Sequence, residues 1–176
     1  LGRTTEALSA HEADFRFTQK KKIMSSYSGA AIRLGNIAET YLALGLISDA
    51  IGFALSAVEL IDQSDDWFQK VHLRSIYGDA LLSAGRPKDA RLAFDEAEAI
   101  QRKQRLAPPL LYAIRNFRYC EAALVGTERY AWNLNMCRAP VALEGPRYSV
   151  TIDDVSKRLG KSYDLCNQEG WLLDAG

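Results

Sequence analysis

Apolar residues recur at intervals of three and four positions through much of this chain, which is the pattern of amphipathic helices. The clearest run is Ile32, Leu34, Ile37, Tyr41 and Leu44. The pattern predicts helices over residues 4–20, 25–44, 50–61, 66–84, 87–104, 110–125 and 151–169. Residues 132–150 show no sustained helical period and contain prolines and glycines, so they are predicted to form a long irregular connection.

The stretch from Ile76 to Ala99 predicts how consecutive helices are joined. Small residues lie on both helices where two backbones would approach, and Gly85-Arg86-Pro87 falls between them. Glycine just after one helix and proline at the first position of the next is typical of a tight helix–helix turn. The two helices are therefore expected to fold back on each other, with further copies needed to bury their outer faces. The second of these helices carries the apolar residues Leu92, Phe94 and Ile100.

Such copies are indicated by a recurring pair of small residues, G-x-x-x-x-A. The pairs begin at Gly2, Gly45, Gly85 and Gly126, at a spacing of roughly 40 residues. A near-constant period of this size is typical of a solenoid of supersecondary units. The predicted fold class is all-α, a right-handed α-solenoid of antiparallel helix pairs.

This periodicity predicts one solenoid over residues 1–176, as a fragment of a longer protein. Residues 1–22 would form the second helix of a truncated repeat, followed by repeats at 25–62 and 65–104. A third repeat at 108–169 would include the irregular insertion at about 132–150, and residues 170–176 would start another helix. Pro108-Pro109 is expected to begin the first helix of that third repeat.

Several polar residues are expected to cap these helices. The candidates are Ser25 or Ser26, Ser48 and Asp49, Asp65 or Asp66, and Thr151 or Asp153. Gly52 lies inside a predicted helix, where glycine costs about 1 kcal/mol relative to alanine. Close approach of a neighbouring helix is a plausible reason for it.

These positions resemble the tetratricopeptide (TPR) repeat family. Gly45 and Gly85 match its turn glycine, and Ala50 and Ala90 match the small residue early in the second helix. Further matches are Ala38 and Gly78, Tyr41 and Leu81, Ala54 and Phe94, and Ala57 and Ala97. The family's terminal proline is replaced by Asp62 and Arg102, and the period is about six residues longer than the usual 34. The long period is similar to that of arrays attached to bacterial NACHT/NB-ARC-like signalling ATPases and transcription activators.

The composition does not favour a nucleic-acid-binding protein or a membrane protein, because the chain has neither an excess of one charge nor a long apolar segment. Twenty-two basic and 22 acidic residues cancel, so no nucleic-acid or anionic membrane partner is expected. No apolar run approaches the ~20 residues of a transmembrane helix, and no secretory leader is recognisable. Three widely spaced cysteines suggest reduced thiols and a cytoplasmic location. Two scattered histidines give no metal site.

No catalytic motif is found, so the protein is predicted not to be an enzyme and to need no cofactor. The sequence lacks a phosphate-binding G-x-x-x-x-G-K-[ST] loop, a G-x-S-x-G nucleophile turn and an H-E-x-x-H zinc motif. The carboxylate pairs at 65–66 and 153–154 precede helices and are better explained as caps than as acid–base catalysts. Cys120 lies in an apolar setting and is expected to be a buried, inert thiol.

The resemblance implies a scaffold that binds a protein, a peptide or another domain of its own chain on a concave face made by the first helix of each pair. On this face the family's pattern places Asn36, Glu39, His72, Ser75, Asp79 and Asn116, beside Ile32, Gly35 and Cys120. Taken singly, each of these residues is also explained as a solvated surface residue. Gly35 and Glu39 stand where a carboxylate-binding Lys/Asn clamp would be needed, so no such clamp is expected.

Other interpretations stay open. The chain could be the ligand-sensing arm of a bacterial signal-transduction ATPase or transcription activator, which would place the ATPase elsewhere. An enzyme fragment would require ionisable groups that converge from several helices. Trp132, Met136 and Tyr148 in the irregular connection could anchor a partner or fold back over the end of the array.

Overall fold

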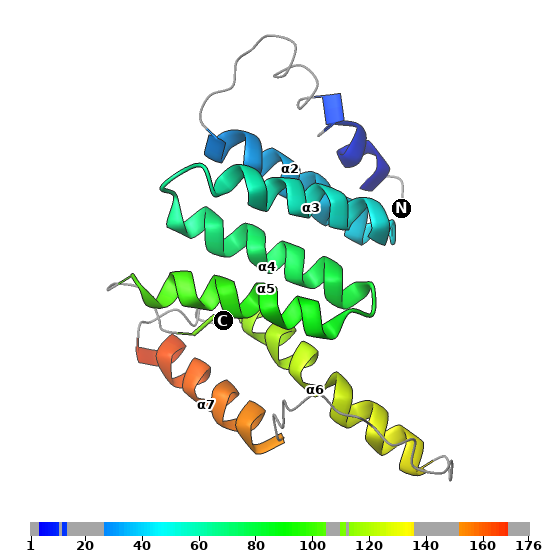
Figure 1. Ribbon diagram of the computed structural model, residues 1–176, viewed down its shortest axis with the longest axis vertical. Helices are drawn as coiled ribbons and strands as arrows, with labels where there is room; N and C mark the ends of the chain where they lie inside the picture. The colour runs from blue at the N-terminus through cyan, green and yellow to red at the C-terminus, as the bar shows by residue number, and fades with distance from the viewer. Residues whose placement is uncertain are drawn as a thin grey trace, which may run out of the picture. The chain divides into compact units, whose positions relative to one another are not determined.

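A computed structural model describes residues 4–10, 12–13, 27–104, 110–111, 113–135 and 152–168. Every regular element in these residues is helical, which confirms the all-α prediction (Figure 1). The chain divides into two compact units, Leu1–Pro109 and Leu110–Gly176. The first unit contains α2 to α5, and the second contains α6 and α7.

The first helix pair consists of α2 (Tyr27–Ala43) and α3 (Ile47–Ile61), which pack against each other. Gly45 joins them with a φ of 76°, a left-handed conformation that glycine adopts without a side-chain penalty. Its N–H donates to the carbonyl of Leu42 at 3.0 Å, and the N–H of Leu46 donates to that of Tyr41 at 2.9 Å. This is the Schellman arrangement, which satisfies carbonyls left without partners at the helix end.

The second pair repeats the first at the spacing of the two turn glycines. Helix α4 (Trp67–Ser83) has the same length as α2 and the same place relative to its glycine, and α5 (Pro87–Arg102) begins two positions after Gly85 as α3 does after Gly45. Gly85 has a φ of 72°, and the same two Schellman bonds run from Gly85 to Leu82 and from Arg86 to Leu81, each at 2.9 Å. The predicted turn glycines are therefore confirmed at both pairs.

The helix starts follow local chemistry, with one correction. The side chain of Asp66 accepts a bond of 3.1 Å from the N–H of Gln69, so Asp66 is the predicted cap of α4, and Pro87 occupies the first turn of α5. Ser48 and Asp49, predicted as caps, lie inside the first turn of α3 instead. Helix α3 begins immediately after the Schellman turn, so no separate capping residue precedes it. Asp49 lies near the N-terminus of α3, where the helix dipole favours a negative charge.

The buried stripes of the two second helices occupy matching positions, several of which are alanine. In α3 the stripe contains Ala50, Ala54, Ala57 and Ile61, and in α5 Ala90, Phe94, Ala97 and Gln101. The phenylalanine of the second helix stands one position further along in the second pair than in the first. Phe53 stacks on Tyr41 in the first pair, with centroids 5.2 Å apart, whereas Phe94 lies against Gly78 in the second. Leu92, one of the apolar residues noted on this helix, is 56% exposed because it lies off this stripe.

The two pairs are joined by close packing between helices of different pairs. α3 contacts α4, and α2 also contacts α4. Gly35 on α2 makes this approach possible, since a β-carbon there would overlap Cδ2 of Leu73 on α4. Ala31, Leu34, Ala54, Ile61 and Leu73 belong to one buried apolar cluster that draws on all three helices. The first unit therefore buries its core between helix pairs as well as within them.

The second unit departs from the regular pattern. Helix α6 (Ala113–Asn135) continues through Gly126, so this fourth glycine of the G-x-x-x-x-A series lies within a helix and not at a turn. Helix α7 (Ile152–Gln168) contacts α6 and begins with Asp153 and Asp154 in its first turn. The irregular connection predicted from about residue 132 is wrong for residues 132–135, which belong to α6. Residues 136–150, 105–109, 14–26 and 169–176 lie outside the described residues, and so do the expectations placed on them.

We predict that Gly52→Ala raises the free energy of unfolding by about 1 kcal/mol. The close approach expected at this glycine is wrong, because a β-carbon at Gly52 would have no neighbour within 4 Å. Alanine then adds helix propensity without a steric penalty. Chemical denaturation followed by circular dichroism measures the change. A destabilised Gly52→Ala variant would contradict the open environment of this position.

Candidate interaction face

The predicted interaction residues of the first unit lie on α2 and α4, two helices in direct contact. Glu39 is exposed, and Asn36, His72 and Asp79 are half-buried. The Oδ1 atom of Asp79 is itself buried. Glu39 and Asp79 each lie six positions before the turn glycine of their own pair, so they occupy equivalent places. We refer to Asn36, Glu39, His72 and Asp79 as the α2–α4 face.

Ser75 and Asn116 do not have the exposure expected of groove residues. Ser75 is only 5% exposed, and its hydroxyl donates to the carbonyl of Val71 at 2.8 Å within its own helix. Asn116 is 3% exposed and lies in the second unit, where its Oδ1 accepts a bond of 2.7 Å from Nε of Arg158. Gly35 and Cys120, placed on the same face, are also buried. The expectation that these four are exposed is wrong, and the burial predicted separately for the Cys120 thiol is confirmed.

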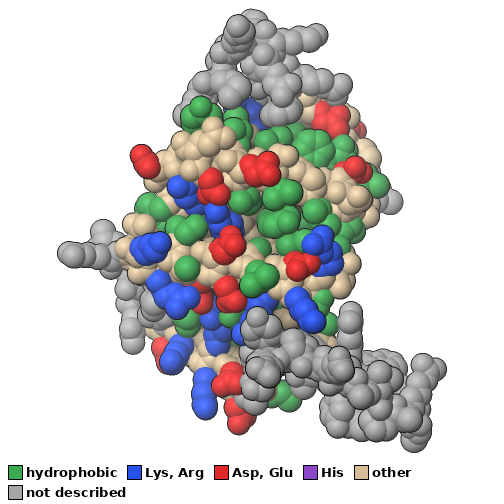
Figure 2. Space-filling view, viewed as in Figure 1, with side chains coloured by type: hydrophobic (Ala, Val, Ile, Leu, Met, Phe, Trp, Pro, Cys, Tyr) green, Lys and Arg blue, Asp and Glu red, His purple; other side chains and the backbone are tan. Residues whose placement is uncertain are grey.

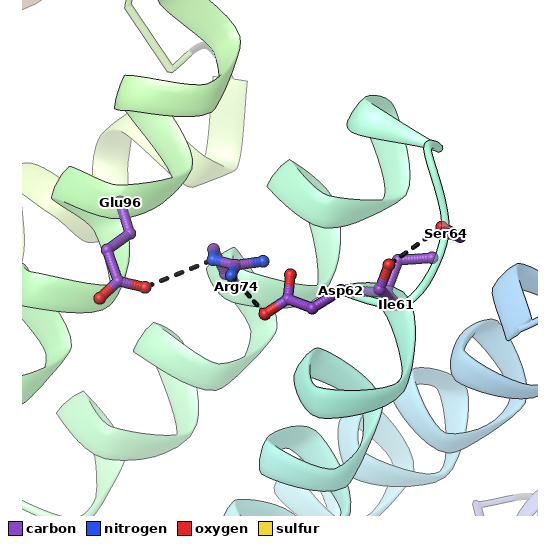
Figure 3. Close-up of polar contacts among 5 residues, drawn as sticks. All are labelled: Ile61, Asp62, Ser64, Arg74 and Glu96. Atoms are coloured by element: carbon purple, nitrogen blue, oxygen red, sulfur yellow. Dashed lines mark hydrogen bonds and ion pairs between the residues drawn. The ribbon is translucent and has the colours of Figure 1, made fainter.

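An arginine that the sequence pattern did not single out links three helices of the first unit. Arg74 on α4 donates to Oδ2 of Asp62 at 2.8 Å and to Oε2 of Glu96 at 3.3 Å, so it joins the end of α3 to α5 (Figure 3). Its side chain is 11% exposed, whereas both carboxylates are well exposed. The equivalent position of the first pair is the buried Leu34, so an ion-pair link replaces an apolar contact in the second pair.

The connection from α3 to α4 is held by its own hydrogen bonds. The hydroxyl of Ser64 donates to the carbonyl of Ile61 at 2.9 Å (Figure 3). The same hydroxyl accepts a bond of 3.2 Å from the N–H of Asp66. Asp66 also accepts a bond of 2.7 Å from the hydroxyl of Ser28 at the start of α2. This hydrogen bond links the start of α2 to the start of α4.

The face of the molecule drawn in Figure 2 carries mixed charge. Figure 2 shows Lys and Arg side chains interspersed with Asp and Glu on the face that it presents. Among the described residues, no group of three or more His, Cys, Asp and Glu could hold a metal ion. No helix in the described part of the chain is long and apolar enough to cross a membrane.

Searches of protein-family models, of curated proteins and of solved structures find no match to this chain. The resemblance to TPR repeats therefore stays a prediction based on the residues named above. The observation that bears on function is the packing of two helix pairs whose elements and turns recur in matching register.

Proposed function

We propose that this protein is a non-catalytic scaffold that binds a protein, a peptide or another domain of its own chain. In this proposal its helix pairs are antiparallel and stack as a right-handed, TPR-like α-solenoid. The partner lies along the first helices of successive pairs, on the α2–α4 face. Binding uses a preformed surface, so little conformational entropy is lost by the scaffold.

The observation that carries this proposal is the repetition of α2–α3 by α4–α5. Helix starts, left-handed glycines and turn hydrogen bonds all recur at the same interval, and α2 lies against α4. Units that repeat in this way contact mainly their neighbours and present equivalent side chains in rows. A row that contains the exposed Glu39 and its equivalent Asp79 is what an extended partner would meet.

The charge of the α2–α4 face indicates which chemical groups a partner would present to it. Glu39 and Asp79 place a carboxylate at the same position of each pair, and Gly35 and Glu39 occupy the positions where a clamp for a C-terminal carboxylate would need Lys and Asn. Carboxylates at a binding surface repel anionic groups and favour donors and cations. We therefore propose a partner segment that presents N–H donors or basic side chains along the α2–α4 face.

We predict that the combined variant Asn36→Ala, His72→Ala and Asp79→Ala reduces partner retention at least tenfold, which is about 1.4 kcal/mol of binding free energy. The measurement is quantitative capture on the immobilised chain, with partners identified by cross-linking from Glu39. A matched control replaces Ser56, Glu59 and Lys88 with alanine, since these residues are exposed on the second helices of the pairs. Equal retention by both variants would exclude the α2–α4 face.

A further inference from the structure

Arg158 on α7 makes two contacts with α6. Nε of Arg158 donates to Oδ1 of Asn116 at 2.7 Å, and its guanidinium carbon lies 3.8 Å from the centre of the Tyr119 ring. Both partners are buried residues of α6. A hydrogen bond to a buried amide and a cation–π contact from the same guanidinium hold the planar group in a single orientation.

The other described side chains of α7 contribute little buried apolar surface. Val155 is buried, but Ile152 is 65% exposed and Tyr163 is 61% exposed, and Leu159 is also exposed. At 3.6 residues per turn these three exposed residues project within about 40° of each other, roughly 120° from Arg158. These three exposed apolar residues therefore lie on a different side of α7 from Arg158. By contrast, α3 and α5 each bury a full stripe.

We propose that α7 is a releasable helix and that Arg158 is the latch that holds it on α6. Release separates the guanidinium from Asn116 and Tyr119 and returns it to water, where a charged group is well solvated. The buried amide and ring of α6 become accessible at the same time. The pairs α2–α3 and α4–α5 keep their own core, so the release leaves them folded.

The latch also explains why Asn116 is not available as a surface residue. An arginine 42 residues further along the chain binds its amide oxygen, and the same arginine covers the neighbouring aromatic ring. Release would uncover Asn116 and Tyr119 together, as a polar group beside an aromatic surface on α6. This conformational step concerns the second unit by itself and does not depend on a partner for the α2–α4 face.

Hydrogen exchange of the full chain, read by mass spectrometry, tests the latch. In the unaltered protein the amides of residues 152–168 should exchange together, and at least tenfold faster than those of α4, because a detached helix of this length is marginal in water. Arg158→Ala should accelerate exchange of residues 152–168 at least tenfold further and leave residues 27–104 unchanged. Arg158→Lys should act similarly, since lysine keeps the charge but lacks Nε and the planar group.

Lys157→Ala provides the matched control, because Lys157 is the adjacent exposed residue on α7. Its exchange profile should equal that of the unaltered protein. The proposal is overturned if Arg158→Ala changes the exchange of residues 152–168 by less than twofold. It is also overturned if Arg158→Ala accelerates α4 and α7 equally, since α7 would then unfold only with the rest of the chain. Neither result would affect the proposed α2–α4 face, which is judged by partner retention.

Discussion

Replacing Phe94 with alanine is expected to lower the free energy of unfolding by about 3–5 kcal/mol. The Phe94 ring is fully buried in the second helix pair, where its Cε1 and Cζ would lie 2.9 Å from a β-carbon at Gly78. Removal of the ring loses its burial and leaves a cavity beside a glycine that cannot fill it. Equilibrium denaturation followed by far-UV circular dichroism measures this loss, and a change below 1 kcal/mol would contradict the observed packing.

The same contact predicts that the effect of Gly78→Ala reverses its sign when Phe94 is removed. With Phe94 present, the added methyl group overpacks a buried ring and should cost about 1–3 kcal/mol. In the Phe94→Ala background the methyl group enters the cavity and adds helix propensity, so it should recover about 1 kcal/mol. The double variant recreates the Ala38–Ala54 pair found at the equivalent positions of α2 and α3. Additive effects in the double-mutant cycle would show that Gly78 and Phe94 are not coupled.

The sequence predicted the helix pairs and their turns because these depend on local chemistry. A left-handed turn requires glycine, a helix start favours Asp66 or Pro87, and neither depends on distant residues. Gly126 continues the G-x-x-x-x-A series but lies inside α6, so it does not mark a turn. Glycine inside a helix costs only about 1 kcal/mol, so the packing of a long helix can override the turn signal.

The residues of the candidate face were predicted less completely, because the exposure of a side chain depends on how closely the neighbouring helix packs against it. Gly35 and Ser75 were placed on the surface by family position, but the absence of a side chain at Gly35 lets α4 approach α2, and Leu73 fills the space. Arg74 and Arg158 were missed altogether. Their partners Asp62, Glu96 and Asn116 are 12, 22 and 42 residues away, and no local pattern connects them. Such pairings become visible only in three dimensions.

The double variant Gly45→Ala and Gly85→Ala is expected to lower the free energy of unfolding by about 2–4 kcal/mol, the sum of two independent strains of about 1–2 kcal/mol. Both glycines have positive φ, and a β-carbon at either would contact nothing within 4 Å. The cost therefore comes from the backbone conformation alone. Urea denaturation of the two single variants and the double variant measures it.

Two substitutions separate this backbone strain from other effects of alanine. Asparagine tolerates the left-handed conformation, so Gly45→Asn and Gly85→Asn should each lose less than the corresponding alanine variants. Gly52→Ala makes the same chemical change in an equally open but helical position and should stabilise the protein. If Gly45→Ala and Gly85→Ala were also stabilising, the left-handed turns that join the helices of each pair, and with them the regular register of the scaffold, would be refuted.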